Sequence, residues 1–190
     1  GEGRTEGRVR EGDRGGSVPR GEPADGELGW YCPERRAILP LDAFHVPRSL
    51  ARTVRSGRYR VTVDLVFEEV IRTCAAPRPE EPESWIDEQI ADVYTCLHRM
   101  GWAHSFEAWS GDRLVAGLYG VAVGGAFFGE SMFHVVTDAS KIALCKLVER
   151  LQQRSYRLHD VQWLTPHLAQ FGAIEIDRRE YLATLELAMK

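Results

Sequence analysis

The fold is decided by residues 114–133, which read LVAGLYGVAVGGAFFGESMF. Leu114–Val123 and the preceding His104–Trp109 flank a Ser-Gly-Asp turn, a pattern typical of a β-hairpin. The glycine and aromatic residues that follow, Gly124–Phe133, predict a third strand that carries Glu130. Because glutamate is rarely buried without a partner, a carboxylate among apolar side chains favours a pocket for a cationic group. From these residues alone, a solvated strand end with Glu130 at its rim stays open as the alternative.

Helical patterns follow and precede this predicted sheet. Residues 86–100 predict a helix with one apolar face. A helix over 137–151 and a strand over 158–164 are expected to follow. A short helix then begins at Thr165-Pro166, and a final helix begins at the capping box Asp177–Glu180. This order predicts an α+β fold with a mixed sheet over residues 85–190.

The N-terminal part has a different composition. Residues 28–76 are expected to form a small α/β lobe, with a strand over 59–63 and a helix capped by Asp64. Prolines in residues 77–84 indicate a linker. Residues 1–27 contain scarcely any large apolar side chains, so they are expected to be disordered.

Composition excludes several classes of protein. The 190 residues carry a net charge of −4, which argues against a general nucleic-acid binder. There is no apolar run of the roughly 18 residues that a membrane span needs. The four cysteines and six histidines lack the spacing of a metal site, so no metal is expected. Seven arginines against one acid in residues 35–60 predict either a phosphate-contacting stripe or an ordinary solvated face.

Several ordered motifs resemble the bacterial leucyl/phenylalanyl-tRNA–protein transferases. The matching segments are Trp30–Arg36 with Leu39-Pro40, Phe44–Leu50, Trp85-Ile86, Tyr94, Gly101–Ser105 with Glu107 and Trp109, Phe128–Phe133, Asp138–Lys141, Asp160–Gln162, Thr165–Leu168 and Gly172-Ala173. The resemblance implies a C-terminal domain like the GNAT acetyltransferase fold. It also implies a cytoplasmic enzyme without a cofactor, which uses leucyl-tRNA and phenylalanyl-tRNA. Such an enzyme transfers Leu or Phe, with Met as a further candidate, to proteins that begin with Lys or Arg and so marks them for N-end rule degradation. We expect a monomer.

The resemblance also suggests roles for individual residues. The catalytic candidates are Asp160, Gln162 and Glu130; the candidates for the aminoacyl side-chain pocket are Met132, Leu144, Leu147 and Leu151; those for adenosine and tRNA binding are Tyr31, Trp85, Tyr94, Arg48, Arg52 and Arg55. Strand alternation predicts Asp160 and Gln162 on one face, with Asp160 holding the Gln162 side-chain amide. Glu130 and Asp160 together are expected to face the cationic N-terminal residue of the acceptor. The simpler alternatives are an exposed polar strand face and ordinary core packing.

The chain also departs from the family pattern. Cys32, Trp102, Val135 and His159 stand where the family usually has other residues, and residues 1–27 lack its Tyr-x-x-Gly-x-Phe-Pro-like motif. A wrong start site or a frameshift would explain that segment. Val135 and the absent motif keep open the alternative of a catalytically impaired member that still binds aminoacyl-tRNA. A CoA-dependent GNAT-like acyltransferase is ranked last, because the chain lacks a clear Gln/Arg-x-x-Gly-x-Gly/Ala pyrophosphate loop.

Overall fold

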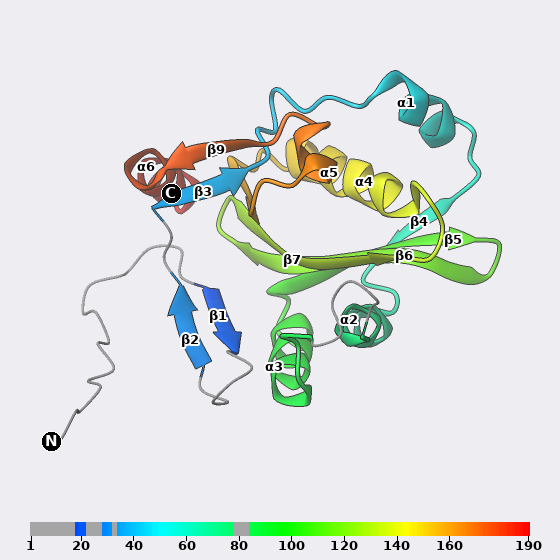
Figure 1. The fold of residues 1–190 in the computed structure, drawn as a ribbon, viewed down its shortest axis with the longest axis horizontal. Helices are drawn as coiled ribbons and strands as arrows, with labels where there is room; N and C mark the ends of the chain where they lie inside the picture. Colours follow the sequence, from blue (N-terminus) through cyan, green and yellow to red (C-terminus); the bar gives the residue numbers. More distant parts are fainter. Residues whose placement is uncertain (1–17, 22–27, 32–33, 78–83) are drawn as a thin grey trace, which may run out of the picture.

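The computed structural model describes residues 18–21, 28–31, 34–77 and 84–190, the first two ranges by their backbone only (Figure 1). In chain order the elements are β1 (Val18–Gly21), β2 (Leu28–Tyr31), β3 (Arg35–Ile38), α1 (Arg48–Arg55), β4 (Arg60–Val63), α2 (Phe67–Ala75), α3 (Glu88–Arg99), β5 (Ala103–Ser110), β6 (Arg113–Val123), β7 (Ala126–His134), α4 (Ala139–Gln153), β8 (Leu158–Gln162), α5 (Pro166–Ala169), β9 (Ile174–Asp177) and α6 (Arg178–Ala188).

Seven strands form one mixed sheet in the order β4-β5-β6-β7-β8-β3-β9. Neighbouring strands are antiparallel, except that β7 and β8 run parallel. A parallel pair needs a crossover connection, and α4 supplies it. β1 and β2 pair with each other as a separate two-stranded sheet.

Helices cover both faces of the large sheet (Figure 1). α4 packs on one face, where Leu144 and Leu147 meet Phe106 and Phe127 in the largest core cluster. α2 and α3 pack on the other face around Tyr119. A third, smaller cluster joins α6 to β8 and β9. The site described below lies on β8, next to residues of β7, α3 and α6.

Gly120 on β6 allows the close approach of β7. A Cβ at this position would meet the Phe127 ring at 2.6 Å and would also collide with the carbonyl oxygen of Phe128. Any larger residue would therefore push β7 away from β6 at the point where β7 bulges.

The sequence predicted most of these elements. The hairpin, the third strand and the helices over 86–100 and 137–151 are confirmed, and the α+β class is confirmed with them. Asp64 was wrong as a helix cap, because α2 begins after Val66. Asp64 instead has a left-handed backbone with φ of 60°, and its carboxylate accepts the Ser105 N–H at 2.9 Å.

The separate N-terminal lobe is not confirmed, since β3 and β4 from that segment join the large sheet at different places. A GNAT-like architecture is likewise not confirmed. Most of the predicted disordered segment 1–27, together with Cys32 and residues 78–83 of the predicted linker, lies outside the described residues. Within the described part of the chain, no helix is both long and apolar enough to cross a membrane.

Candidate functional site

Two β-bulges aim side chains into the space beyond the end of the β7–β8 pair. The last paired residues of these two strands are Phe128 and Asp160. On β7 the register against β6 shifts at Glu130, and on β8 the register against β3 shifts at Val161. An extra residue bends its strand and redirects the neighbouring side chains, which is why bulges are common beside active sites.

Asp160 is fully buried and hydrogen-bonded on both oxygens. Arg36 Nε on β3 donates to Oδ1 at 3.0 Å and to Oδ2 at 2.8 Å. The Tyr181 hydroxyl on α6 donates to Oδ2 at 2.7 Å, and the Gln162 backbone N–H donates to Oδ1 at 2.7 Å. Arg36 is itself only 4% exposed. A buried carboxylate is tolerated here because it is paired and its oxygens are satisfied.

Glu130 is only partly buried, and it receives two side-chain hydrogen bonds. The Tyr94 hydroxyl on α3 donates one of them, and Gln162 Nε2 donates the other to Oε2 at 3.0 Å. Burial raises the pKa of Glu130 to about 7, and the nearby Asp160 charge adds to this, while the two hydrogen bonds and the charge of Arg36 oppose it. A carboxyl group with this pKa exchanges its proton near neutral pH.

Gln162 is held by its backbone and its side chain. Its φ of 66° lies in the left-handed region, which costs a non-glycine residue roughly 1–3 kcal/mol. Its Nε2 donates to the Gly129 carbonyl oxygen at 3.0 Å as well as to Glu130. The side-chain amide therefore bridges β8 to β7.

Two expectations about these carboxylates were wrong. Asp160 does not hold the Gln162 side-chain amide; it binds the Gln162 backbone N–H, because the bulge and the positive φ turn the two side chains apart. Asp160 also does not face a cationic substrate beside Glu130, because it is fully buried and bound to Arg36. Glu130 is the less buried residue of the pair.

Comparisons with known proteins agree on one family. The family model for leucyl/phenylalanyl-tRNA protein transferase matches residues 38–186. The chain belongs to the leucyl/phenylalanyl-tRNA–protein transferase family. The transferase of that name from Phenylobacterium zucineum is 55% identical over 157 residues, covering 83% of this chain and 71% of the relative. The one from Nitrobacter winogradskyi is 50% identical over 176 residues, covering 92% and 78%. Among solved structures, L-PGS from Bacillus licheniformis matches with a TM-score of 0.48 and 11% identity over 82% of this chain and 64% of that one, a likeness too weak to bear on function.

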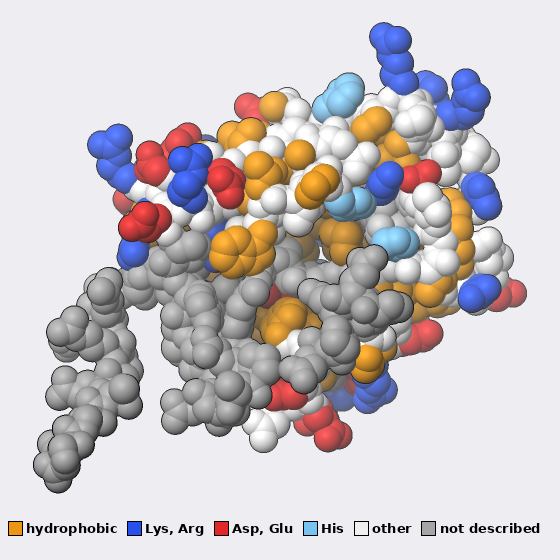
Figure 2. All heavy atoms as spheres, viewed as in Figure 1, with side chains coloured by type: hydrophobic (Ala, Val, Ile, Leu, Met, Phe, Trp, Pro, Cys, Tyr) orange, Lys and Arg blue, Asp and Glu red, His pale blue; other side chains and the backbone are white. Residues whose placement is uncertain are grey.

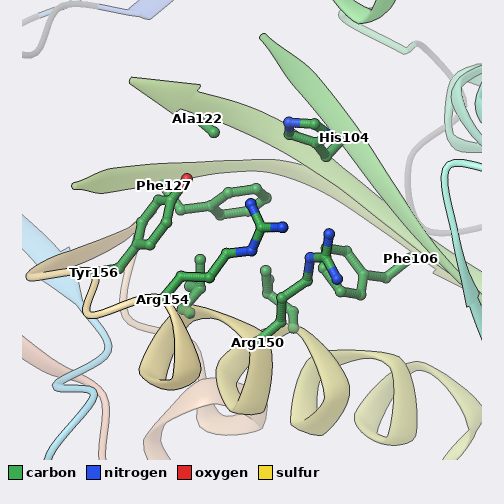
Figure 3. Close-up of a pocket in the computed structure, with 9 residues that line it drawn as sticks. His104, Phe106, Ala122, Phe127, Arg150, Arg154 and Tyr156 are labelled. Carbon is green, nitrogen blue, oxygen red and sulfur yellow. The ribbon is translucent and has the colours of Figure 1, made fainter. Parts of the chain in front are cut away.

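Two of the four residues predicted to line the pocket for the aminoacyl side chain do line a cavity. Leu147 and Leu151 on α4 contribute to a cavity of about 40 Å³ between this helix and the sheet, with Phe127 opposite. Figure 3 shows Arg150 on α4, and Arg154 directly after the end of this helix, reaching toward the strands beside it. Leu144 is buried in the same core, and Met132 packs against that core partly buried. The cavity has room for roughly three water molecules, so a leucyl or phenylalanyl side chain requires its walls to move.

The predicted tRNA-binding arginines lie together on α1. Arg48, Arg52 and Arg55 are all exposed, and Figure 2 shows Lys and Arg side chains (blue) over the end of the molecule where Figure 1 draws α1. An apolar groove of about 540 Å³ lies beside them, between α1, β4 and α4, and Val54 and Ile142 are on its walls.

The predicted adenosine-stacking residues have different environments. Tyr94 is buried, with its ring edge-on to Tyr119 at 5.2 Å between centroids, and its hydroxyl bonds Glu130. It therefore serves the carboxylate in this conformation and does not present a free ring face. Trp85 is partly buried against the core around Tyr119. Tyr31 lies in β2, and its side chain is outside the described residues.

Sequence reasoning missed Arg36 and Tyr181. Arg36 lies inside a matched segment, but the motif gave it no role, and no motif pointed to Tyr181. Their contacts with Asp160 span 124 and 21 residues of sequence, and local patterns carry no signal for such pairs. Among the described residues, no group of three or more His, Cys, Asp or Glu side chains could hold a metal ion.

Proposed function

We propose that this chain transfers Leu or Phe, with Met as a further candidate, from aminoacyl-tRNA to proteins with an N-terminal Lys or Arg. Aminoacyl transfer from tRNA to protein is the activity of its family. In this reaction an amide bond forms between the acceptor nitrogen and the aminoacyl carbonyl carbon. The ester bond to the tRNA breaks, and a proton passes from the amine to the departing ribose oxygen.

Glu130 is the proton acceptor in this proposal, and the hydrogen-bonded group Tyr94–Glu130–Gln162 is the observation that carries it. An α-amino group has a pKa near 8. A carboxylate with a pKa of about 7 takes up a proton from such a group and returns it without a large free-energy step. Glu130 is also less buried than Asp160, which is fully buried.

Gln162 and Asp160 position this proton acceptor. The Gln162 amide is fixed by Gly129 and Glu130, so it limits where the Glu130 carboxylate can move. Asp160 acts one step further away, since it holds the Gln162 backbone N–H. Holding reacting groups in one geometry is a large part of catalysis when the ester already supplies the driving force.

The substrate groups are assigned to the surrounding surfaces. The transferred side chain enters between α4 and the sheet at Leu147 and Leu151, and an apolar wall of this kind accepts Leu, Phe or Met. The exposed arginines of α1 contact the tRNA backbone. The preference for N-terminal Lys or Arg and the link to N-end rule degradation rest on the family resemblance.

Transfer of labelled Leu from charged tRNA to a model protein with an N-terminal Arg tests this function. The wild type should transfer the label, and a matched acceptor with N-terminal Ser should receive little. Glu130→Gln should lose transfer while still binding charged tRNA. Binding of charged tRNA by the wild type without transfer would refute the catalytic proposal and identify an impaired member of the family.

A further inference from the structure

The Nη2 group of Arg36 donates a hydrogen bond to none of the described residues. Its Nε is committed to both oxygens of Asp160, and its guanidinium carbon lies 5.8 Å from the centroid of the Tyr181 ring. Its Nη2 is buried, and none of the described residues accepts a hydrogen bond from it. Buried donors are nearly always satisfied, and each exception requires an explanation, such as a role in catalysis or an absent ligand.

The unused donor belongs to the proposed site. Arg36 binds Asp160, Asp160 accepts the Gln162 backbone N–H, and the Gln162 side-chain amide binds Glu130, so hydrogen bonds connect the guanidinium to the proton acceptor. Arg36 is fixed from three elements, since it extends from β3, binds Asp160 on β8 and stacks near Tyr181 on α6. A donor held this firmly does not need to reorganise when charge develops next to it.

The donors of Gln162 and Tyr94 described above already have acceptors. Gln162 Nε2 donates to Gly129 and Glu130, the Gln162 backbone N–H donates to Asp160, and the Tyr94 hydroxyl donates to Glu130. Attack of an amine on an ester moves negative charge onto the carbonyl oxygen, and that oxygen needs a donor.

We propose that Arg36 Nη2 donates a hydrogen bond to the aminoacyl carbonyl oxygen and stabilises the oxyanion that forms on it. This assignment rests on the proposed function. The guanidinium keeps all its protons throughout, so the step adds no transfer beyond that of the amine proton. Asp160 then also positions Arg36, because it holds the guanidinium through Nε while Nη2 has no acceptor among the described residues.

The test is the steady-state kinetics of transfer by Arg36→Lys, with Arg35→Lys as the matched control. Lysine keeps the charge that Asp160 needs but lacks the second guanidinium nitrogen. Arg35 is the exposed neighbour and pairs with Glu175 at 3.3 Å, away from Asp160. Arg36→Lys should lower kcat by about 10²–10³ with little change in KM for charged tRNA, which is the usual cost of losing an oxyanion donor. Arg35→Lys should match the wild type.

The pH profile separates this role from an effect through Glu130. If Arg36 acted only by its charge on Glu130, Arg36→Lys would keep the wild-type rate and Arg36→Gln would shift the acid limb to higher pH. A wild-type kcat for Arg36→Lys overturns the proposal. If Arg36→Lys fails to fold, Arg36→Ala folded in the presence of guanidinium takes its place, because that ion can pair with Asp160. Restoration of transfer by guanidinium and not by methylammonium supports the proposal, and equal restoration by both overturns it. A wild type that transfers nothing overturns the proposed function itself.

Discussion

Replacing Glu130 by Gln should stabilise the protein while it removes activity. The pKa of Glu130 stands at about 7, against an ordinary value of 4.5, chiefly because of burial. Between pH 4.5 and pH 7 the folded chain therefore still holds the Glu130 proton, whereas the unfolded chain has released it. Folding stability contributed by this group falls as pH rises from about 4.5 to 7 and is constant above that. The difference between the two values corresponds to at most about 3 kcal/mol.

Glutamine is neutral at every pH and avoids this cost. Urea unfolding of the wild type and of Glu130→Gln at pH 5, 6, 7 and 8 should give a stability difference in favour of the variant that grows toward neutral pH and then levels off. Because both proteins share all other titrating groups, the difference isolates Glu130. Transfer by the variant should fall by about 10²–10⁴, as expected for loss of a proton acceptor. A stability difference that does not change with pH would refute the raised pKa and, with it, the argument for Glu130 as the acceptor.

Three further predictions concern the groups around Glu130 and on α1. Asp160→Ala should destabilise the fold by about 3–5 kcal/mol, since it leaves Arg36 buried and unpaired, and urea unfolding measures this; a decrease below about 1 kcal/mol would contradict a tight pair. Tyr94→Phe should raise the pKa of Glu130 further and move the acid limb of the transfer profile up by roughly one pH unit, because the variant cannot donate a hydrogen bond to the charged form; an unmoved limb would contradict that bond. Replacing the three α1 arginines by Gln should weaken the salt dependence of tRNA binding in filter assays. The slope of log K against log salt concentration should become shallower by about 0.7–0.9 for each phosphate that the variant no longer neutralises. An unchanged slope would remove α1 from the tRNA surface.

The sequence predicted those elements whose signal is local. The apolar face of residues 86–100 and the hairpin over 104–123 have clear periodicity, and both are confirmed as α3 and as β5 with β6. β3 and β9 have four residues each, and their pairing with each other and with β8 is non-local, so no alternation pattern indicated them. The same limit applied to the site. Glu130, Asp160 and Gln162 were found by motif, but the motif gave neither the bulges nor Arg36.

The two bulges explain why the site forms at the end of the β7–β8 pair. A parallel ladder that continued past Phe128 and Asp160 would satisfy the Gly129 carbonyl from the backbone of β8. The bulges interrupt this ladder, and the Gln162 side chain takes over the Gly129 carbonyl while it also binds Glu130. Asp160 compensates the other strand in the same way, because it accepts the Gln162 backbone N–H. Each side chain that replaces a missing ladder bond is therefore also held in a fixed position for the reaction. For this reason Gln162→Ala should reduce stability and transfer together, whereas Glu130→Gln should separate them.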